Sequence, residues 1–67
     1  MYTHHTNLGP AIRARRVALG ANQFEMAIPT GRHPGDISRM ERGLRNMPSD
    51  VYVACDNFLT EYERHTN

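Results

Sequence analysis

The sequence predicts an all-α fold, a compact bundle of roughly four to five short helices. Apolar residues recur at spacings of three and four, which places them on one face of a helix. Glycines, prolines and helix-capping residues stand between the periodic segments, where helices begin and end. The 67 residues suffice for a single domain, which we expect over 8–62, with flexible tails over 1–7 and 63–67.

The first helix is expected over residues 8–19. Ile12 and Leu19 lie on one face of this segment, seven residues apart. Pro10 falls in the first helical turn, where its missing N–H interrupts no intrahelical hydrogen bond. Gly20 follows the last periodic residue and readily adopts the left-handed conformation that ends a helix.

The second helix is expected over residues 23–29. Asn22 and Glu25 have the spacing of a capping box, in which the two side chains satisfy free N–H groups of the first turn. Pro29 ends or kinks this helix, because an interior proline lacks the N–H and clashes with the preceding turn. The residues expected to supply its apolar contacts are Phe24, Ala27 and Ile28.

The third helix is expected over residues 34–42. Pro34 suits the first helical position, and Asp36 lies in the first turn, where a negative charge favours the positive end of the helix. Ile37 and Met40 are three residues apart and are expected to point into the core. The side chains expected to point outward are Ser38, Arg39 and Arg42.

The last helix is expected over residues 49–62, and Ser49 can cap its N-terminus. Its apolar residues follow the spacings of one broad face, so we expect this helix to complete the core. These residues are Val51, Ala54, Cys55, Phe58, Leu59 and Tyr62.

Composition excludes several classes of protein. No segment approaches the ~18 consecutive apolar residues of a membrane span, and the first residues lack the basic and apolar regions of a signal peptide. The single cysteine, Cys55, can form neither an internal disulfide nor a cysteine-rich zinc site. His4, His5 and His65 lack a ligand spacing, so we expect no metal and no cofactor. No motif places a histidine beside a serine or the cysteine, so neither an enzyme nor a small-molecule substrate is expected.

The charges are distributed unevenly along the chain, although the formal net charge is only +1. Residues 9–47 carry seven arginines against three acidic residues. Residues 48–67 carry four acidic residues against one arginine. The first segment can therefore face phosphate groups.

A set of residues in the middle of the chain carries a resemblance to a known family. They are Gln23, Ala27, Gly31, Ile37, Glu41 and Gly43. This ungapped pattern resembles the phage repressor and Cro family of helix-turn-helix DNA-binding domains, also called XRE-type or lambda-repressor-like, over roughly residues 8–59. The resemblance implies that the third helix enters the major groove of DNA and that the N-terminus of the second meets a phosphate.

The resemblance also implies, by position, which residues contact DNA. The base-contacting candidates are Arg39, Gly35, Asp36 and Ser38. Arg39 is the strongest of them, because arginine bidentate to guanine is the commonest specific contact. The phosphate-contacting candidates are Asn22, Gln23, Arg32, His33, Arg42, Arg45 and Asn46. Helix capping remains the alternative role for Asn22 and Gln23, and a solvated surface remains the alternative for the arginines.

Two further sets concern structure and assembly. Arg16 and Glu41 match a family pair that joins the first helix to the end of the third, so we expect a bracing ion pair. One small domain contacts little DNA, so a homodimer is expected. The candidates for its surface, with core packing as the alternative, are Tyr52, Phe58, Leu59 and Tyr62.

The function expected from these features is that of a sequence-specific transcriptional regulator, a phage or prophage repressor or Cro-like protein. It would bind a double-stranded operator in the cytoplasm of a bacterial host, associated with the nucleoid. The alternative is a protein-binding module on the same scaffold, such as an antirepressor that blocks a repressor. Pro34 and Gly35 stand where relatives most often carry base-contacting side chains, and this favours the alternative, as does the acidic second segment.

Overall fold

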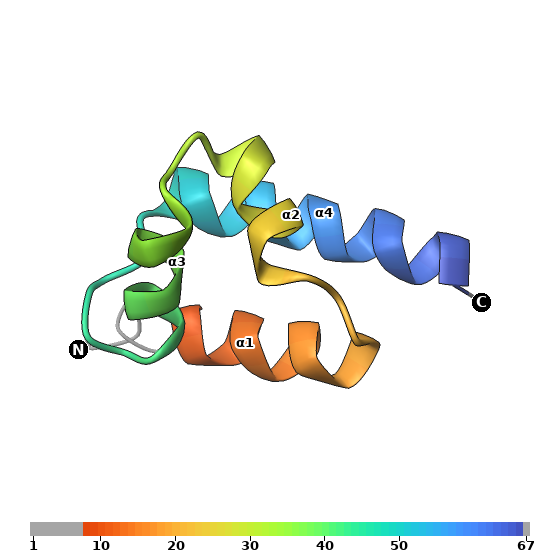
Figure 1. The fold of residues 1–67 in the computed structure, drawn as a ribbon, viewed down its shortest axis with the longest axis horizontal. Helices are drawn as coiled ribbons and strands as arrows, with labels where there is room; N and C mark the ends of the chain where they lie inside the picture. Colours follow the sequence, from red (N-terminus) through yellow and green to blue (C-terminus); the bar gives the residue numbers. More distant parts are fainter. Residues whose placement is uncertain (1–7, 67) are drawn as a thin grey trace.

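The computed structural model describes residues 8–66, so residues 1–7, with His4 and His5, and Asn67 lie outside the described part. Four α-helices and one short 3-10 helix make up the fold, and the described residues form no strand (Figure 1). The helices are α1 (Leu8–Leu19), α2 (Gln23–Ala27), η2 (Ile28–Thr30), α3 (Pro34–Glu41) and α4 (Ser49–Thr66). The predicted all-α bundle of short helices is thereby confirmed.

The second helix is shorter than the predicted 23–29, because Pro29 interrupts it. Helix α2 ends at Ala27, and the next three residues tighten into η2. Proline has no N–H for the next α-helical hydrogen bond, so the chain continues with a tighter turn. Thr30 Oγ1 donates to the Ala27 carbonyl at 2.6 Å, and Gly31 ends the turn with a left-handed φ of 71°.

The last helix is longer than predicted. Residues 63–66 belong to α4, whereas the sequence pattern assigned them to a flexible tail. This last turn has no apolar residues, and polar contacts within the helix stabilise it. Thr66 Oγ1 donates to the Tyr62 carbonyl at 3.1 Å, and His65 Nε2 lies 3.2 Å from Glu61 Oε1. Basic residues also suit the C-terminal end of a helix, which carries partial negative charge.

The helices pack so that the loop-rich part of the chain lies at one end. Helix α4 packs against α1, α2 and η2, and α3 packs against α1 and α2. In Figure 1, α3 and the loop that follows it lie at the left end of the molecule, and the C-terminal end of α4 lies at the right. Helices α1 and α4, at the two ends of the described chain, pack against each other. Helix α3 packs against α1, and α2 packs against α4.

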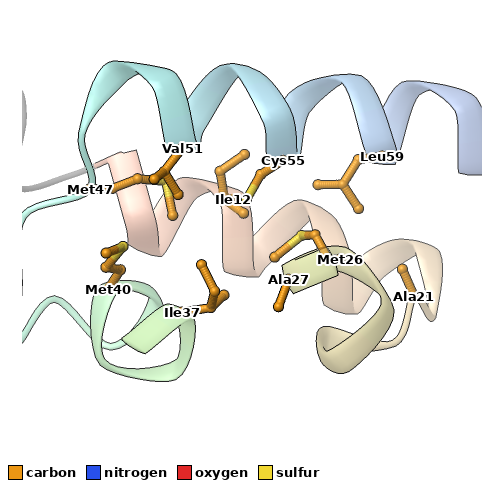
Figure 2. Packing of buried hydrophobic residues seen from close by; sticks show 10 residues of the cluster. All are labelled: Ile12, Ala21, Met26, Ala27, Ile37, Met40, Met47, Val51, Cys55 and Leu59. Carbon is orange, nitrogen blue, oxygen red and sulfur yellow. The ribbon is translucent and has the colours of Figure 1, made fainter. Parts of the chain in front are cut away.

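The core is built by apolar side chains from every α-helix and from two connecting segments (Figure 2). Its buried members are Ile12, Ala21, Met26, Ala27, Ile37, Met40, Met47, Val51, Cys55 and Leu59. The predicted inward positions of α3 are occupied as expected, since Ile37 and Met40 are fully buried. Ala54, Phe58 and Tyr62, also assigned to the core face of α4, are only partly buried.

Two of the apolar contacts predicted for the second helix are wrong. Phe24 and Ile28 have exposed fractions of 65% and 77%, and Met26 and Ala27 fill the core instead. A helix turns about 100° per residue, so the face centred on Met26 and Ala27 leaves Phe24 and Ile28 on the far side. The segment therefore displays an apolar pair one turn apart on the surface.

Gly9 is the point of closest approach between α1 and α3. A Cβ atom added there would lie 1.8 Å from the Met40 carbonyl oxygen and 2.5 Å from its carbonyl carbon. No side chain fits in that space, so glycine is required for the two helix backbones to touch. This contact fixes where α3 lies relative to α1.

Candidate nucleic-acid interface

A buried ion pair ties α3 to α1. Arg16 Nε donates to Glu41 Oε2 at 2.7 Å, and Arg16 Nη2 donates to Glu41 Oε1 at 3.0 Å. The third nitrogen, Nη1, donates to the Ala21 carbonyl at 3.0 Å. Glu41 is only 2% exposed, so its carboxylate depends on these donors for stabilisation. Arg16 and Glu41 are therefore structural residues.

Gln23 belongs to the same buried network. Its Nε2 donates to Glu41 Oε1 at 2.8 Å, so the side chain points into the molecule. This bond uses one of the two Nε2 hydrogens of the half-buried Gln23, so its predicted phosphate contact stays a prediction. Asn22 caps α2, and its Oδ1 accepts from the Glu25 N–H at 3.1 Å. The Nδ2 of the exposed Asn22 side chain is not used by this cap.

The N-terminus of α3 is capped by a histidine, a role that the sequence analysis missed. His33 Nδ1 accepts from the Gly35 N–H at 2.9 Å. An imidazole nitrogen that accepts this bond carries no proton, and in that tautomer the ring N–H is at Nε2. His33 is exposed, and this Nε2–H is a donor available to an anion beside the start of α3.

Three candidate DNA-contacting residues meet at one carboxylate. Asp36 Oδ1 accepts from Arg39 Nη1 at 3.3 Å and from Arg45 Nη1 at 3.1 Å. The side chains of both arginines are 54% exposed and that of Asp36 is 33% exposed. Arg39 lies on the outer face of α3, and Arg45 comes from the loop before α4. The structure thus joins the helix and the loop through side chains that all remain accessible.

The remaining candidates flank this cluster. Arg42 lies at the C-terminal end of α3, and its Nε–H donates to the Ser38 carbonyl at 3.4 Å. The Ser38 residue itself is partly buried. Arg32 and Asn46 are exposed, in the turn before α3 and in the loop after it. The base-contacting and phosphate-contacting candidates other than Asn22 and Gln23 therefore belong to α3 and its two flanking segments.

The positive and negative charges of the folded molecule are only partly separated, because Asp50 lies in the first turn of α4, soon after the loop that follows α3. Residues 31–46 contain four arginines, and Asp36 is the only acidic residue among them that is not buried. Helix α4 carries four acidic residues and one arginine. Arg15, on α1, pairs with Asp56 of α4 and donates to Thr60 Oγ1 at 2.9 Å, so it joins α1 to α4. Figure 1 shows α3 and its following loop at the end of the molecule away from the C-terminal end of α4.

The candidate dimer surface on α4 is largely used for internal packing. Leu59 is fully buried in the core, so its assignment to a dimer surface is wrong. Tyr62 donates its hydroxyl to the Gly20 carbonyl at 3.2 Å, and its ring lies 6.1 Å from that of Phe58. Tyr52, Phe58 and Tyr62 are partly buried against the core. Each retains a partly exposed surface.

Cys55 lies at the centre of the molecule, where its environment holds it neutral. Burial and, to a smaller extent, the negative charge of Glu41 raise the pKa of the Cys55 thiol from 9.0 to about 11. A thiol that stays protonated is a poor nucleophile. Cys55 therefore acts as a small apolar residue of the core.

Residues 8–66 offer few other features at which chemistry could occur. No group of three or more histidine, cysteine, aspartate or glutamate residues within them could hold a metal ion. Their surface has no pocket that could enclose a small molecule. None of their helices combines the length and apolar content needed to cross a membrane.

No family model, curated protein or solved structure matches the chain.

Proposed function

We propose that the protein is a sequence-specific DNA-binding transcriptional regulator, similar in type to phage repressors and Cro proteins. In this proposal α2, the turn at Gly31 and α3 form a helix-turn-helix, and α3 enters the major groove. One observation carries it: the outer face of α3 and its two flanking segments display four arginines, all exposed, with one partly exposed carboxylate among them. Such a basic surface around a helix is typical of DNA-binding proteins.

The dimensions of α3 and the chemistry at its start support the same proposal. An α-helix with its side chains is about 10–12 Å across, so α3 fits the major groove, which is roughly 12 Å wide. At the start of α3 the His33 Nε2–H suits a phosphate at the edge of the groove, whereas the Gly35 and Asp36 N–H groups already donate to His33. In this placement Arg39 contacts a guanine, and Arg42 and Arg45 contact phosphates on either side.

A regulator of this size would bind its operator as a homodimer, because one domain buries too little surface on DNA for tight and specific binding. Two copies related by a two-fold axis would select an operator with two-fold symmetry. Such a function places the protein in the cytoplasm of a bacterial host, with its DNA.

Selection from a pool of random DNA duplexes tests the proposal. We expect enrichment of a palindromic motif that contains a guanine in each half-site. Binding to the enriched duplex is expected to weaken steeply as salt is added, because phosphate contacts release counterions. A pool that gives no enriched motif, or an affinity that salt leaves unchanged, would refute the proposal.

A second candidate function is favoured by the exposed pair on α2 and η2. Phe24 and Ile28 lie four residues apart, and both are largely exposed. Apolar side chains gathered on a surface are common at protein–protein contacts. In this alternative the protein is an antirepressor that binds a repressor through this face. Salt-insensitive binding to a folded repressor, abolished by Phe24→Ser and Ile28→Ser together, would favour it over DNA binding.

A further inference from the structure

We propose that Asp36 is a specificity-determining positioning residue, which holds Arg39 ready for a guanine and lowers affinity for DNA of any other sequence. The inference rests on the proposed DNA-binding function and deepens it. It departs from the expectation that Asp36 itself contacts a base, because Asp36 Oδ1 accepts hydrogen bonds from two arginines.

The contact between Asp36 and Arg39 leaves two nitrogen donors of the guanidinium free for a base. Asp36 binds Arg39 through Nη1 at 3.3 Å, and the Arg39 guanidinium makes no other hydrogen bond or ion pair within residues 8–66. Nε and Nη2 are therefore both available as a pair of parallel donors, the arrangement that guanine O6 and N7 accept. A guanidinium held at one nitrogen loses less conformational freedom when it binds than a free one does.

The Arg39 guanidinium lies close to Gly35, in the first turn of α3. A Cβ atom on Gly35 would lie 3.9 Å from Arg39 Nη1 and 3.1 Å from His33 Nδ1. The guanidinium is thus directed back towards the first turn of α3, over a residue without a side chain. A side chain at position 35 would crowd the His33 ring, at 3.1 Å, whereas 3.9 Å is an ordinary van der Waals distance to Arg39 Nη1; contact of Gly35 with a base stays a prediction.

The second arginine explains why the carboxylate also suppresses non-specific binding. Arg45 Nη1 donates to the same oxygen at 3.1 Å, so one negative charge partly compensates two positive charges. A phosphate must compete with Asp36 for Arg45, and it is repelled by the carboxylate itself. At the correct operator the guanine contact offsets this repulsion, whereas at other sequences nothing does.

The test compares two duplexes of equal length, the selected operator and a scrambled version of it, for the wild type and Asp36→Asn. We expect Asp36→Asn to bind the scrambled duplex more tightly and to bind the operator no more tightly than the wild type. The ratio of the two affinities should fall roughly tenfold, within the range of one lost bidentate contact. Binding to the scrambled duplex should also show a salt dependence steeper by about one ion, since Arg45 is freed for a phosphate.

Two variants separate charge from position. Glu25→Gln removes one negative charge from the first turn of α2, where residues 8–66 give Glu25 no arginine partner. It should change the affinities for both duplexes by the same factor and leave their ratio unchanged. Asp36→Glu keeps the charge and displaces the carboxylate by one methylene group, so it should weaken the operator complex alone. Helical circular dichroism and thermal melting establish that each variant is folded.

The outcomes distinguish this inference from the function on which it rests. A wild-type protein that enriches no motif would overturn both. A wild type that selects an operator, with an Asp36→Asn ratio unchanged or equal to that of Glu25→Gln, would overturn the role of Asp36 and leave the DNA-binding function standing. In an Arg39→Ala background, Asp36→Asn should no longer change the ratio, and an undiminished effect there would show that Asp36 does not act through Arg39.

Discussion

Arg16 and Glu41 are joined by two hydrogen bonds, at 2.7 and 3.0 Å, and the Glu41 side chain is only 1% exposed. Arg16→Ala would leave this carboxylate buried with only the Gln23 amide as a donor. We expect a loss of about 3–5 kcal/mol in the free energy of unfolding, the usual cost of removing one partner of a buried pair. Denaturant unfolding followed by circular dichroism measures it.

The neighbouring arginine provides the matched control. Arg15 pairs with Asp56, but their side chains are 34% and 41% exposed, so water screens the pair. Arg15→Ala should therefore cost less than about 1 kcal/mol. Equal losses for the two variants would show that burial of Glu41 adds nothing to the stability of the fold.

Gly9→Ala is expected to destabilise the protein, although alanine is the better helix former by about 0.5–1 kcal/mol. The new Cβ would lie 1.8 Å from the Met40 carbonyl oxygen, so α1 and α3 must move apart. Such overpacking typically costs about 1–3 kcal/mol. Thermal melting decides the sign, and a higher melting temperature than that of the wild type would contradict the contact. Ala14→Gly, at an exposed position of α1, measures the propensity effect alone.

Stability is expected to fall at alkaline pH because of Cys55. Its pKa is raised from 9.0 in the unfolded chain to about 11 in the folded protein, first by burial and then by Glu41. Between these values the folded state retains a proton that the unfolded state has lost, so the stabilisation is complete below pH 9 and declines as the pH rises towards 11. The loss is on the order of 2–3 kcal/mol.

Denaturant unfolding of the wild type and Cys55→Ala across this interval tests the effect. The variant has no thiol to ionise, so its stability should decline less steeply with pH, while the other titrating groups act alike in both proteins. Parallel declines would show that the thiol does not titrate differently in the folded and unfolded states.

The long helices could be predicted from the sequence because their patterns are long enough. Helix α1 begins and ends where the spacing of Ile12 and Leu19, followed by Gly20, places it. Helix α2 has five residues, too few for a periodic pattern to define which face is buried, and this is why Phe24 and Ile28 were assigned to the core. The buried face of α2 is set by its packing against α3 and α4.

The candidate interface was predictable only in part. The resemblance places Arg39 on the outer side of α3, and the structure leaves it exposed there. The meeting of Arg39 and Arg45 at Asp36 depends on the path of the loop after α3, which no periodicity in the sequence describes. The close contact at Gly9 is equally non-local, since it depends on a carbonyl group of α3.

Arg39 and Arg42 are expected to differ in what their removal does to DNA binding. Both are exposed on or beside α3, but Arg39 stands over its first turn and Arg42 folds against its C-terminal end. If Arg39 contacts a guanine, Arg39→Ala should weaken the selected operator by about 1–3 kcal/mol and relax the preference at one base pair of each half-site. If Arg42 contacts a phosphate, Arg42→Ala should weaken all duplexes alike and reduce the salt dependence by about one ion. Titration of both variants against the operator and its single-base variants at several salt concentrations separates these effects, and equal losses on every duplex for Arg39→Ala would remove it from the sequence-reading role.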